Sequence, residues 1–364
     1  MASEPVASGQ GHCLVEIRTT DAMGKGLFAI KNIPRGTQIL AEVPILAIPA
    51  GSQVDLDDDL PAFCAALRDL PKTEWKRLDE LYCNTALITL ERRAKIREWY
   101  KEKGITDKVG APLNGKKLQD VAKAATKRFA IFLTNRAQMG FADKSDTGVF
   151  SYYSRINHSC VPNVHNSYNP GLQRLTLYSV RDVSAGEQIT TSYFDSACRT
   201  RQQRRQETEN WGFVCSCIAC SDPSTEPVRA RLFKLDQRLA LYESPLRKAA
   251  LSNPSPMARL FARSSMPLSL SEALTDAEEL AELLKKQGLE GMPLGRAYRE
   301  CSKYSIRLGL MSKAVEYAQK ELDNERYCIG TETAHLQKDM VGAEYWLAHL
   351  QRLDKAKGSV GSSR

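Results

Sequence analysis

Apolar and polar residues follow a strand-like pattern in the first part of the chain, where turn residues interrupt short apolar stretches. Leu27–Ile33 and Gln38–Ile48 are rich in apolar and β-branched residues, and a turn sequence at 34–36 separates them. Short apolar stretches bounded by turn residues are typical of β-strands. The same pattern returns at Leu175–Val183 and Glu187–Tyr193. We therefore predict that strands lie on both sides of the middle of the chain.

The period changes to a helical one between about Leu60 and Arg136. Apolar residues there recur every three or four positions, as they do at Val121, Ala125 and Phe129. This spacing puts apolar side chains on one face of a helix. Pro71 and the glycines near position 110 divide the block, so several helices are expected.

After Pro223 the pattern is almost entirely helical. Each of four segments has an apolar stripe: Leu270–Lys286, Arg296–Leu308, Lys313–Glu325 and Thr333–Leu350. The loose similarity of adjacent hairpins predicts a helical, tetratricopeptide-like domain over 223–355. We expect a disordered tail over 356–364, because its composition is small and polar.

Composition and charge narrow the class of protein. The chain has 364 residues, 42% hydrophobic and 26% charged, with a net charge of +8. These values are ordinary for a globular protein, and the length allows two domains. No apolar run approaches the roughly 18 residues of a membrane span, and the N-terminus lacks the pattern of a secretory signal. We therefore expect an intracellular protein that binds no membrane.

The basic residues are densest at 199–205, where four arginines stand without interleaved aromatic residues. They are Arg199, Arg201, Arg204 and Arg205. Such a run is usually a solvated helix face, and a phosphate-binding stripe is the alternative. The first interpretation is favoured, so we expect no direct binding to nucleic acid.

Ten cysteines are scattered along the chain apart from one tight group, Cys215, Cys217 and Cys220. Thiolates at this spacing can bind one side of a zinc ion, which needs four ligands in a tetrahedron. Cys160 is our candidate for the fourth ligand, and His165 is its rival. Because no histidine lies near the three cysteines, a structural site with four cysteine ligands is favoured over a catalytic one.

Four segments in a fixed order carry a resemblance to a known family. They are Gly24–Ala29 (GKGLFA), Arg155–Cys160 (RINHSC), Gly186–Tyr193 (GEQITTSY) and Trp211–Cys220 (WGFVCSCIAC). Together they resemble SET-domain methyltransferases, and among these the SMYD-type group. The resemblance covers roughly residues 14–222, and the helical C-terminus matches only in general character.

The resemblance implies an α+β fold, a SET-type β-clip of small curled sheets. In that fold the NHSC segment (Asn157–Cys160) and the tyrosine segment (Gly186–Tyr193) cross, which brings residues that are distant in the sequence to one site. A SET domain over 14–222 would contain a helical insert at about 50–145 and a post-SET zinc loop at 211–222. The insert holds only Cys64 and Cys83 and no histidine. We therefore expect that the MYND zinc finger usual in SMYD-type proteins is absent.

The resemblance also assigns roles to individual residues. Tyr193 would be the catalytic residue. The cofactor S-adenosylmethionine would contact the following residues: Lys25, Gly26, Leu27, Asn135, Asn157, His158, Tyr193 and Phe213. Structural zinc would be held by Cys160, Cys215, Cys217 and Cys220. Plain structural alternatives stay open: a turn at Gly24–Gly26, a helix end at Asn135 and packing at Phe213.

The chemistry implied is methyl transfer to a protein lysine. The donor carbon and the acceptor nitrogen must be held in line at roughly 3 Å with water kept away. The acceptor amine must also be neutral, although its free pKa is about 10.4. We expect a monomeric protein-lysine N-methyltransferase of the nucleus or cytoplasm, which could bind a protein partner on its helical C-terminal domain. The alternatives are a scaffold that has lost catalysis and a SET fold that acts on a small molecule.

Overall fold

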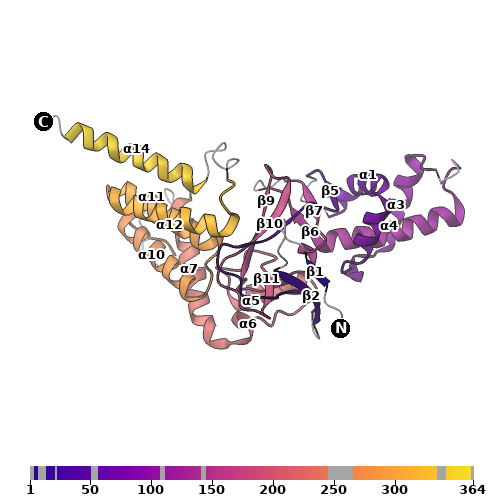
Figure 1. The fold of residues 1–364 in the computed structure, drawn as a ribbon, viewed down its shortest axis with the longest axis horizontal. Helices are drawn as coiled ribbons and strands as arrows, with labels where there is room; N and C mark the ends of the chain where they lie inside the picture. The colour runs from indigo at the N-terminus through magenta and orange to yellow at the C-terminus, as the bar shows by residue number, and fades with distance from the viewer. Residues whose placement is uncertain are drawn as a thin grey trace, which may run out of the picture. The chain divides into compact units, whose positions relative to one another are not determined.

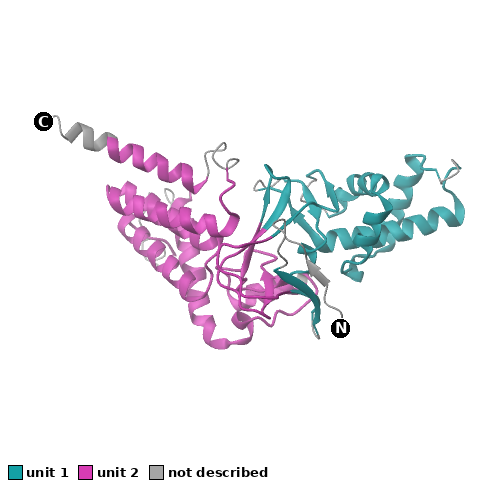
Figure 2. Ribbon diagram, viewed as in Figure 1, with its two compact units in different colours: residues 1–27, 40–156, 167–176 teal, residues 28–39, 157–166, 177–364 magenta. Residues whose placement is uncertain are grey.

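The structure is a computed structural model of the 364-residue chain. It describes residues 4–6, 14–20, 23–50, 56–106, 111–140, 145–244, 265–333 and 342–361. The chain divides into two compact units that alternate along the sequence (Figure 2). Unit 1 contains residues 1–27, 40–156 and 167–176, and unit 2 contains residues 28–39, 157–166 and 177–364. Each unit is therefore built from segments that are far apart in the sequence.

Unit 1 contains short strands in its first segment and near both ends of its longest segment, 40–156. The strands are β1 (Glu4–Val6), β2 (Val15–Thr20), β3 (Gly24–Ala29), β4 (Gln38–Glu42), β5 (Leu46–Ile48), β6 (Arg136–Gln138) and β7 (Thr147–Val149). Antiparallel pairing puts β7 between β5 and β6, so that Val149 faces Leu46 on one side and Arg136 on the other. The predicted strand at 38–48 is thus two strands, β4 and β5, with Pro44 between them. Proline has no backbone N–H and ends strand pairing at this position.

In the sequence, the helices of unit 1 lie between β5 and β6. They are α1 (Leu60–Asp69), α2 (Lys72–Asp79), α3 (Leu90–Glu102) and α4 (Gly115–Asn135). Phe63, Phe129 and Phe132 are fully buried, and the ring centroids of Phe63 and Phe129 are 5.0 Å apart. Phe129 and Phe132 share one face of α4 because three residues are close to one helical turn. The helices of the insert therefore share one apolar core with β5 and β7 within unit 1.

Four strands bring together the segments of the chain that contain the candidate site. They are β8 (Asn157–His158), β9 (Val164–Asn169), β10 (Arg174–Ser179) and β11 (Gln188–Thr191). β11 pairs with β8 in parallel and follows β3 in the sheet order. The last two residues of β3 belong to unit 2 with β8 and β11. β4, β10 and β9 form a second sheet, and each contributes residues to both units.

The helices of unit 2 follow β11 in the sequence. They are α5 (Arg201–Asn210), α6 (Ile218–Ser221), α7 (Glu226–Glu243), α10 (Leu270–Lys286), α11 (Met292–Arg307), α12 (Met311–Ile329) and α14 (Ala343–Gly361). From α7 to α14, each helix packs against the next one in this order (Figure 1). Their shared core includes Leu235, Leu280 and Cys301. The structure thus contains the helical array that the periodicity predicts.

Within unit 2 the helical array is joined to the strands at Arg35 and Gly36. The guanidinium of Arg35 forms an ion pair with Glu290 at 2.8 Å and lies over the ring of Tyr327. Gly36 has a positive φ of 79°, and a β-carbon there would lie 2.7 Å from a ring carbon of Tyr327. Only glycine fits this close approach without strain. The C-terminal helices are therefore packed against the strands of unit 2.

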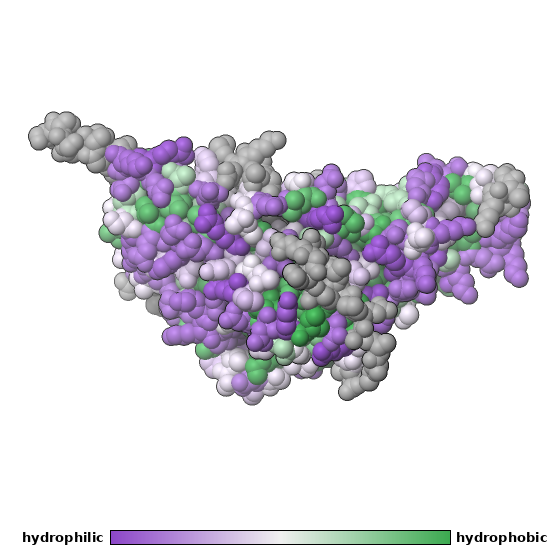
Figure 3. All heavy atoms as spheres, in the orientation of Figure 1, coloured by the Kyte–Doolittle hydropathy of each residue, from purple (hydrophilic) through white to green (hydrophobic). Residues whose placement is uncertain are grey.

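The mixed α+β class predicted from the sequence is confirmed, because small sheets, a helical insert and a helical C-terminal part are all present. Helix α14 is described as far as Gly361, through most of the predicted tail, and 362–364 lie outside the described residues. The boundary predicted at residue 222 stays a prediction. None of the described helices is long and apolar enough to cross a membrane. Hydrophilic side chains cover most of the helical parts on the face drawn in Figure 3.

Candidate functional site

The segments that contain Asn157 and Tyr193 meet in the parallel pairing of β8 with β11. Thr191 lies opposite His158 in this register. The backbone N–H of Ser159 donates to the carbonyl of Thr191 at 2.9 Å, and the backbone N–H of Tyr193 donates to Nδ1 of His158 at 3.1 Å. These bonds hold Ser159, just after β8, and Tyr193, two residues after β11, in place. Tyr193 is thereby fixed beside His158.

Five side chains of unit 2 form an aromatic cluster, which consists of His158, Tyr193, Phe194, Trp211 and Phe213. The ring centroid of Tyr193 lies 5.3 Å from His158, 5.2 Å from Trp211 and 6.1 Å from Phe213. The ring of His158 stacks on Phe194 at 4.9 Å. These separations are typical of favourable aromatic pairs. The structure therefore brings three predicted site residues, His158, Tyr193 and Phe213, together with two that were not predicted.

The end of α5 turns Trp211 and Phe213 toward this cluster. The carbonyl of Thr208 accepts hydrogen bonds from the backbone N–H groups of both residues, each at 3.1 Å. Between them, Gly212 has a positive φ of 82°. A glycine in this left-handed conformation commonly ends a helix. The sequence Trp-Gly-Phe could have indicated this helix end, although it could not identify the partner of Trp211.

Burial sets the protonation of the two polar rings in the aromatic cluster. It raises the pKa of Tyr193 to about 12 and lowers the pKa of His158 to about 4. In both cases a low-dielectric environment disfavours the charged form. Both rings are therefore neutral near pH 7, and neutral His158 can accept the hydrogen bond from the Tyr193 backbone.

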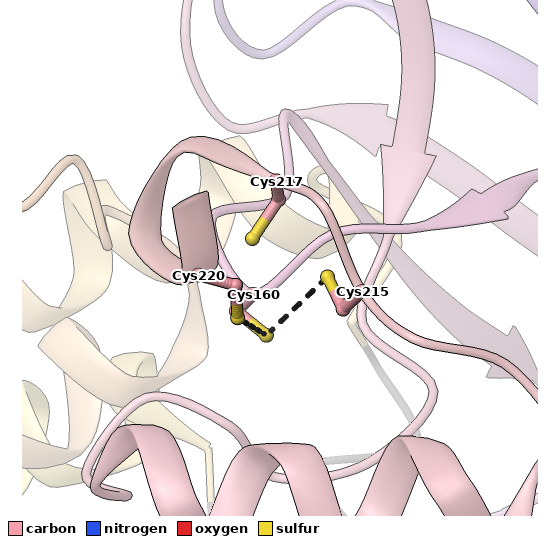
Figure 4. A group of neighbouring side chains, drawn as sticks. All are labelled: Cys160, Cys215, Cys217 and Cys220. Atoms are coloured by element: carbon pink, nitrogen blue, oxygen red, sulfur yellow. Dashed lines mark hydrogen bonds between the residues drawn. The ribbon is translucent and has the colours of Figure 1, made fainter. Parts of the chain in front are cut away.

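Four thiols of unit 2 converge next to the aromatic cluster (Figure 4). Cys160 follows β8, Cys215 and Cys217 lie in the loop after α5, and Cys220 lies in α6. Their sulfur atoms all lie within 4.8 Å of one another, and the Sγ of Cys160 is 3.6 Å from that of Cys220 and 4.0 Å from that of Cys215. Zinc–sulfur bonds of roughly 2.3 Å in a tetrahedron separate the sulfurs by about 3.8 Å. This group can therefore hold a zinc ion.

Contacts within the thiol cluster shift the pKa values of its thiols in both directions, and those with Cys215, Cys217 and Cys220 raise the pKa of Cys160. The contact with Cys160, followed by those with Cys215 and Cys220, lowers the pKa of Cys217 well below its ordinary value. The thiolate is the form that binds metal. Among the described residues, these four are the one group of at least three metal-binding side chains close enough to share an ion. His165, the rival ligand, lies in β9 outside this group.

Two buried arginines next to the thiol cluster were not predicted as site residues. Arg204 of α5 and Arg229 of α7 both have exposed fractions of 0%. The solvated-face interpretation fits Arg205, whose side chain is 67% exposed, and is wrong for Arg204. The sequence has no signal for this burial, because it depends on how the fold brings Ala219 and Glu226 to α5.

Asn157 lies in unit 2, and the remaining four predicted cofactor residues, Lys25, Gly26, Leu27 and Asn135, lie in unit 1. Lys25 is exposed and Leu27 is fully buried in β3, where they flank Gly26. Asn135 is the last residue of α4, and its side-chain nitrogen donates to the carbonyls of Ile131 and Tyr82, each at 2.7 Å. Asn135 thus lies at a helix end, as the structural alternative for this residue proposed. The joint role of these residues with Asn157, His158 and Phe213 in cofactor binding stays a prediction.

A comparison with protein families identifies part of this architecture. The family model of the SET domain matches residues 24–194. The chain carries a SET domain. The matched range of the SET domain begins at Gly24 of β3, includes Asn157, and ends one residue after Tyr193. The resemblance that the sequence motifs predict is therefore confirmed.

Curated relatives also share the SET domain. Histone-lysine N-methyltransferase set5 of Schizosaccharomyces pombe is 35% identical over 112 residues, which are 31% of this chain and 35% of that protein. Protein-lysine N-trimethyltransferase SMYD5 of Homo sapiens is 36% identical over 90 residues, 24% of this chain and 22% of that protein. A putative SET domain-containing protein of Acanthamoeba polyphaga mimivirus is 26% identical over 204 residues, 54% of this chain and 73% of that protein. The matches span about a third or less of the set5 and SMYD5 proteins.

Proposed function

We propose that this chain is a protein-lysine N-methyltransferase that uses S-adenosylmethionine. The observation that supports this most is the position of Tyr193 within the SET domain. Its backbone is bonded to His158 beside the β8–β11 pair, and its ring belongs to the aromatic cluster. Relatives named as histone-lysine and protein-lysine methyltransferases support the same reaction and a protein lysine as substrate.

Bound S-adenosylmethionine would supply a methyl group on a positively charged sulfur, and the lysine nitrogen would accept it and release a proton to solvent. The aromatic cluster suits this reaction, because its rings exclude water and disfavour a charged amine. Tyr193 can orient the amine through its hydroxyl. Since its pKa is about 12, that hydroxyl stays protonated near pH 7 and acts by positioning.

The residues proposed to hold the cofactor come from five segments of the chain. They are Lys25, Gly26, Leu27, Asn135, Asn157, His158, Tyr193 and Phe213. The β8–β11 pairing puts Asn157 opposite Thr190, and His158 accepts a hydrogen bond from the backbone of Tyr193, which supports the inclusion of both residues. Asn135 would have to contribute through its side-chain oxygen, because its nitrogen already donates to two carbonyls.

We also propose that Cys160, Cys215, Cys217 and Cys220 hold a structural zinc ion. The sulfur separations of 3.6 and 4.0 Å support a site with four thiolates, close to the spacing expected of tetrahedral zinc. The ion would tie the end of the NHSC segment to the loop that follows Phe213. Its role is to hold the aromatic cluster together.

The wider proposals follow from the same assignment. We propose a SET domain over 14–222 without a MYND finger, followed by a helical domain over 223–355 that offers a surface to a protein partner. We also propose a monomer in the nucleus or cytoplasm that binds no nucleic acid directly. These proposals depend on the SET domain and on the packing of helices α7 to α14.

The test is methyl transfer by the purified full chain. The chain is incubated with radiolabelled S-adenosylmethionine and fractionated cell extract, and labelled species are separated by size. We expect a labelled protein, and Tyr193→Phe should reduce labelling by about a hundredfold because the amine loses its positioning group. Tyr168→Phe, a half-buried tyrosine outside the aromatic cluster, should label as the parent does.

Two results would contradict the proposal at different levels. A Tyr193→Phe variant as active as the parent would remove the catalytic role of Tyr193. If the parent binds no S-adenosylmethionine by calorimetry and labels nothing, the scaffold interpretation takes its place. If label is found only in small molecules, the substrate is a small molecule and not a protein lysine.

A further inference from the structure

Arg204 and Arg229 are buried cations without a matching buried acid. Both have exposed fractions of 0%, and the Nε atom of each has no hydrogen-bond partner. The nearest acid to Arg204 is Glu226, at 4.0 Å, and its carboxylate already accepts the backbone N–H of Arg201. In the described part of the chain, Arg229 forms no ion pair. Buried charges are normally paired, so these two require another source of negative charge.

The hydrogen bonds of Arg229 join three separate segments. Its Nη1 donates to the carbonyl of Ala197 at 2.9 Å, and its Nη2 donates to the carbonyl of Cys160 at 3.2 Å. Ala197 lies four residues after Tyr193, and Cys160 is one of the four thiols. Arg229 of α7 therefore bridges the thiol cluster and the segment that follows the proposed catalytic tyrosine.

Arg204 contacts the other side of the thiol cluster. Its Nη2 donates to the carbonyl of Ala219, the residue before Cys220, and its Nη1 donates to the carbonyl of Arg199. Two cations thus share one buried region with the thiols.

The two positive charges are complementary to a thiol cluster that binds a metal as thiolates. A doubly charged zinc ion with four thiolates has two negative charges in total, and the two guanidinium groups have two positive charges. With neutral thiols, the same region would contain two buried cations and Glu226 as the one nearby acid. With neutral thiols, Arg204 would therefore have only Glu226 at 4.0 Å, and Arg229 would have no ion-pair partner among the described residues.

We propose that Arg204 and Arg229 are the counter-charges of a zinc–thiolate site, and that Arg229 positions the segment after Tyr193 in response to metal binding. This inference rests on the proposed zinc site. Outer groups that bond to a metal site commonly change its affinity by roughly tenfold to a hundredfold. The two arginines are positioning residues, since neither is placed in contact with a substrate.

The test separates charge from shape at Arg229. Full-length Arg229→Met keeps most of the volume and removes the charge, whereas Arg229→Lys keeps the charge and loses the planar fork. Arg231→Met is the matched control, because Arg231 lies on the same helix and pairs with Glu279 at the surface. Zinc affinity is measured by competition with a chromophoric chelator, and far-UV circular dichroism checks the fold.

We expect Arg229→Met to lower zinc affinity by roughly tenfold to a hundredfold, Arg229→Lys by clearly less, and Arg231→Met not at all. Cobalt in place of zinc should give the parent the absorption spectrum of a tetrahedral thiolate site. This spectrum should change in Arg229→Met and should be close to that of the parent in Arg229→Lys. Parent-like affinity in folded Arg229→Met, or equal losses for Met and Lys, would overturn the charge role.

The same pair of substitutions at Arg204 repeats the test at a second position. It gives a result even where Arg229→Met does not fold, because the Met variant must again bind zinc more weakly than the Lys variant. All measurements are made without a methyl donor. A parent that binds no zinc therefore overturns this inference and leaves methyl transfer untouched, whereas absent methyl transfer leaves the zinc result intact.

Discussion

The helical insert of unit 1 and the cysteine region of unit 2 are stabilised in different ways. The insert buries large apolar side chains, among them Phe63, Phe129 and Phe132, with exposed fractions of 0%. In the described part of the segment 195–230, the buried apolar side chains are those of Ala197 and Ala219. That segment instead contributes three of the four clustered thiols and two buried arginines.

This contrast shows what each region needs in order to fold. Apolar packing stabilises the insert through burial of area, which needs no ligand and no particular charge state. Two alanines bury too little area to hold a loop, so we expect the cysteine region to depend on its thiols, its arginines and the proposed zinc ion. We therefore expect the two regions to respond differently to mutation, metal removal and pH.

The largest effect is expected from Cys217→Ser. The change removes one of four proposed zinc ligands, and structural zinc supplies apparent binding free energies of roughly 10–16 kcal/mol in small metal-dependent domains. We expect loss of bound zinc and a greater loss of stability than any single core truncation causes. Metal content by mass spectrometry and thermal unfolding measure this. Cys83→Ser, in the insert, should leave both unchanged, and a Cys217→Ser protein with parent-like zinc content would refute the site.

Phe129→Ala should have the next largest effect, and it should lower stability without changing zinc binding. Truncating a fully buried aromatic side chain typically destabilises a protein by about 3–5 kcal/mol through lost burial and the resulting cavity. Zinc affinity should stay unchanged, because the cavity forms in the insert. Urea unfolding and chelator competition measure the two quantities, and Lys123→Ala on the exposed face of the same helix is the control. A fall in zinc affinity would mean that the two regions are not independent.

The smallest effect concerns buried charge elsewhere in unit 2. Burial raises the pKa of Glu321 to about 7 from an ordinary value of 4.5, although Arg299 contacts its carboxylate at 2.6 Å. The folded protein therefore holds this proton more tightly than the unfolded chain does. The stability that protonation confers is present at low pH and is lost as the pH rises from about 4.5 to 7, by at most about 3 kcal/mol.

Glu321→Gln should remove this pH dependence, because an amide does not titrate. Unfolding free energies of the parent and the variant at pH 5.5 and 7.5 should differ more at the higher pH. Glu316→Gln, an exposed position on the same helix, should follow the parent. If the parent and Glu321→Gln respond equally to pH, Glu321 does not titrate in this range.

Much of the site could be predicted because its information is local. The spacing of Cys215, Cys217 and Cys220 indicates a metal site by itself, and the four motifs together predict the SET domain that the family comparison confirms. Residues whose roles depend on distant neighbours were missed. Trp211 lies against Tyr193 only because the end of α5 turns toward β11, and Arg204 is buried only because the loop of α6 covers it.

The sequence alone determined the mixed α+β class, the helical periodicity and the residues able to bind a metal, since these depend on side-chain type and short-range spacing. The tertiary structure decided which distant segments meet. The β8–β11 pairing puts Tyr193 beside His158, and the chain path brings Cys160 to the three later thiols. Helix α7 brings Arg229 to the carbonyls of Cys160 and Ala197. A buried charge or a metal site depends on what surrounds it, and the folded chain alone supplies those surroundings.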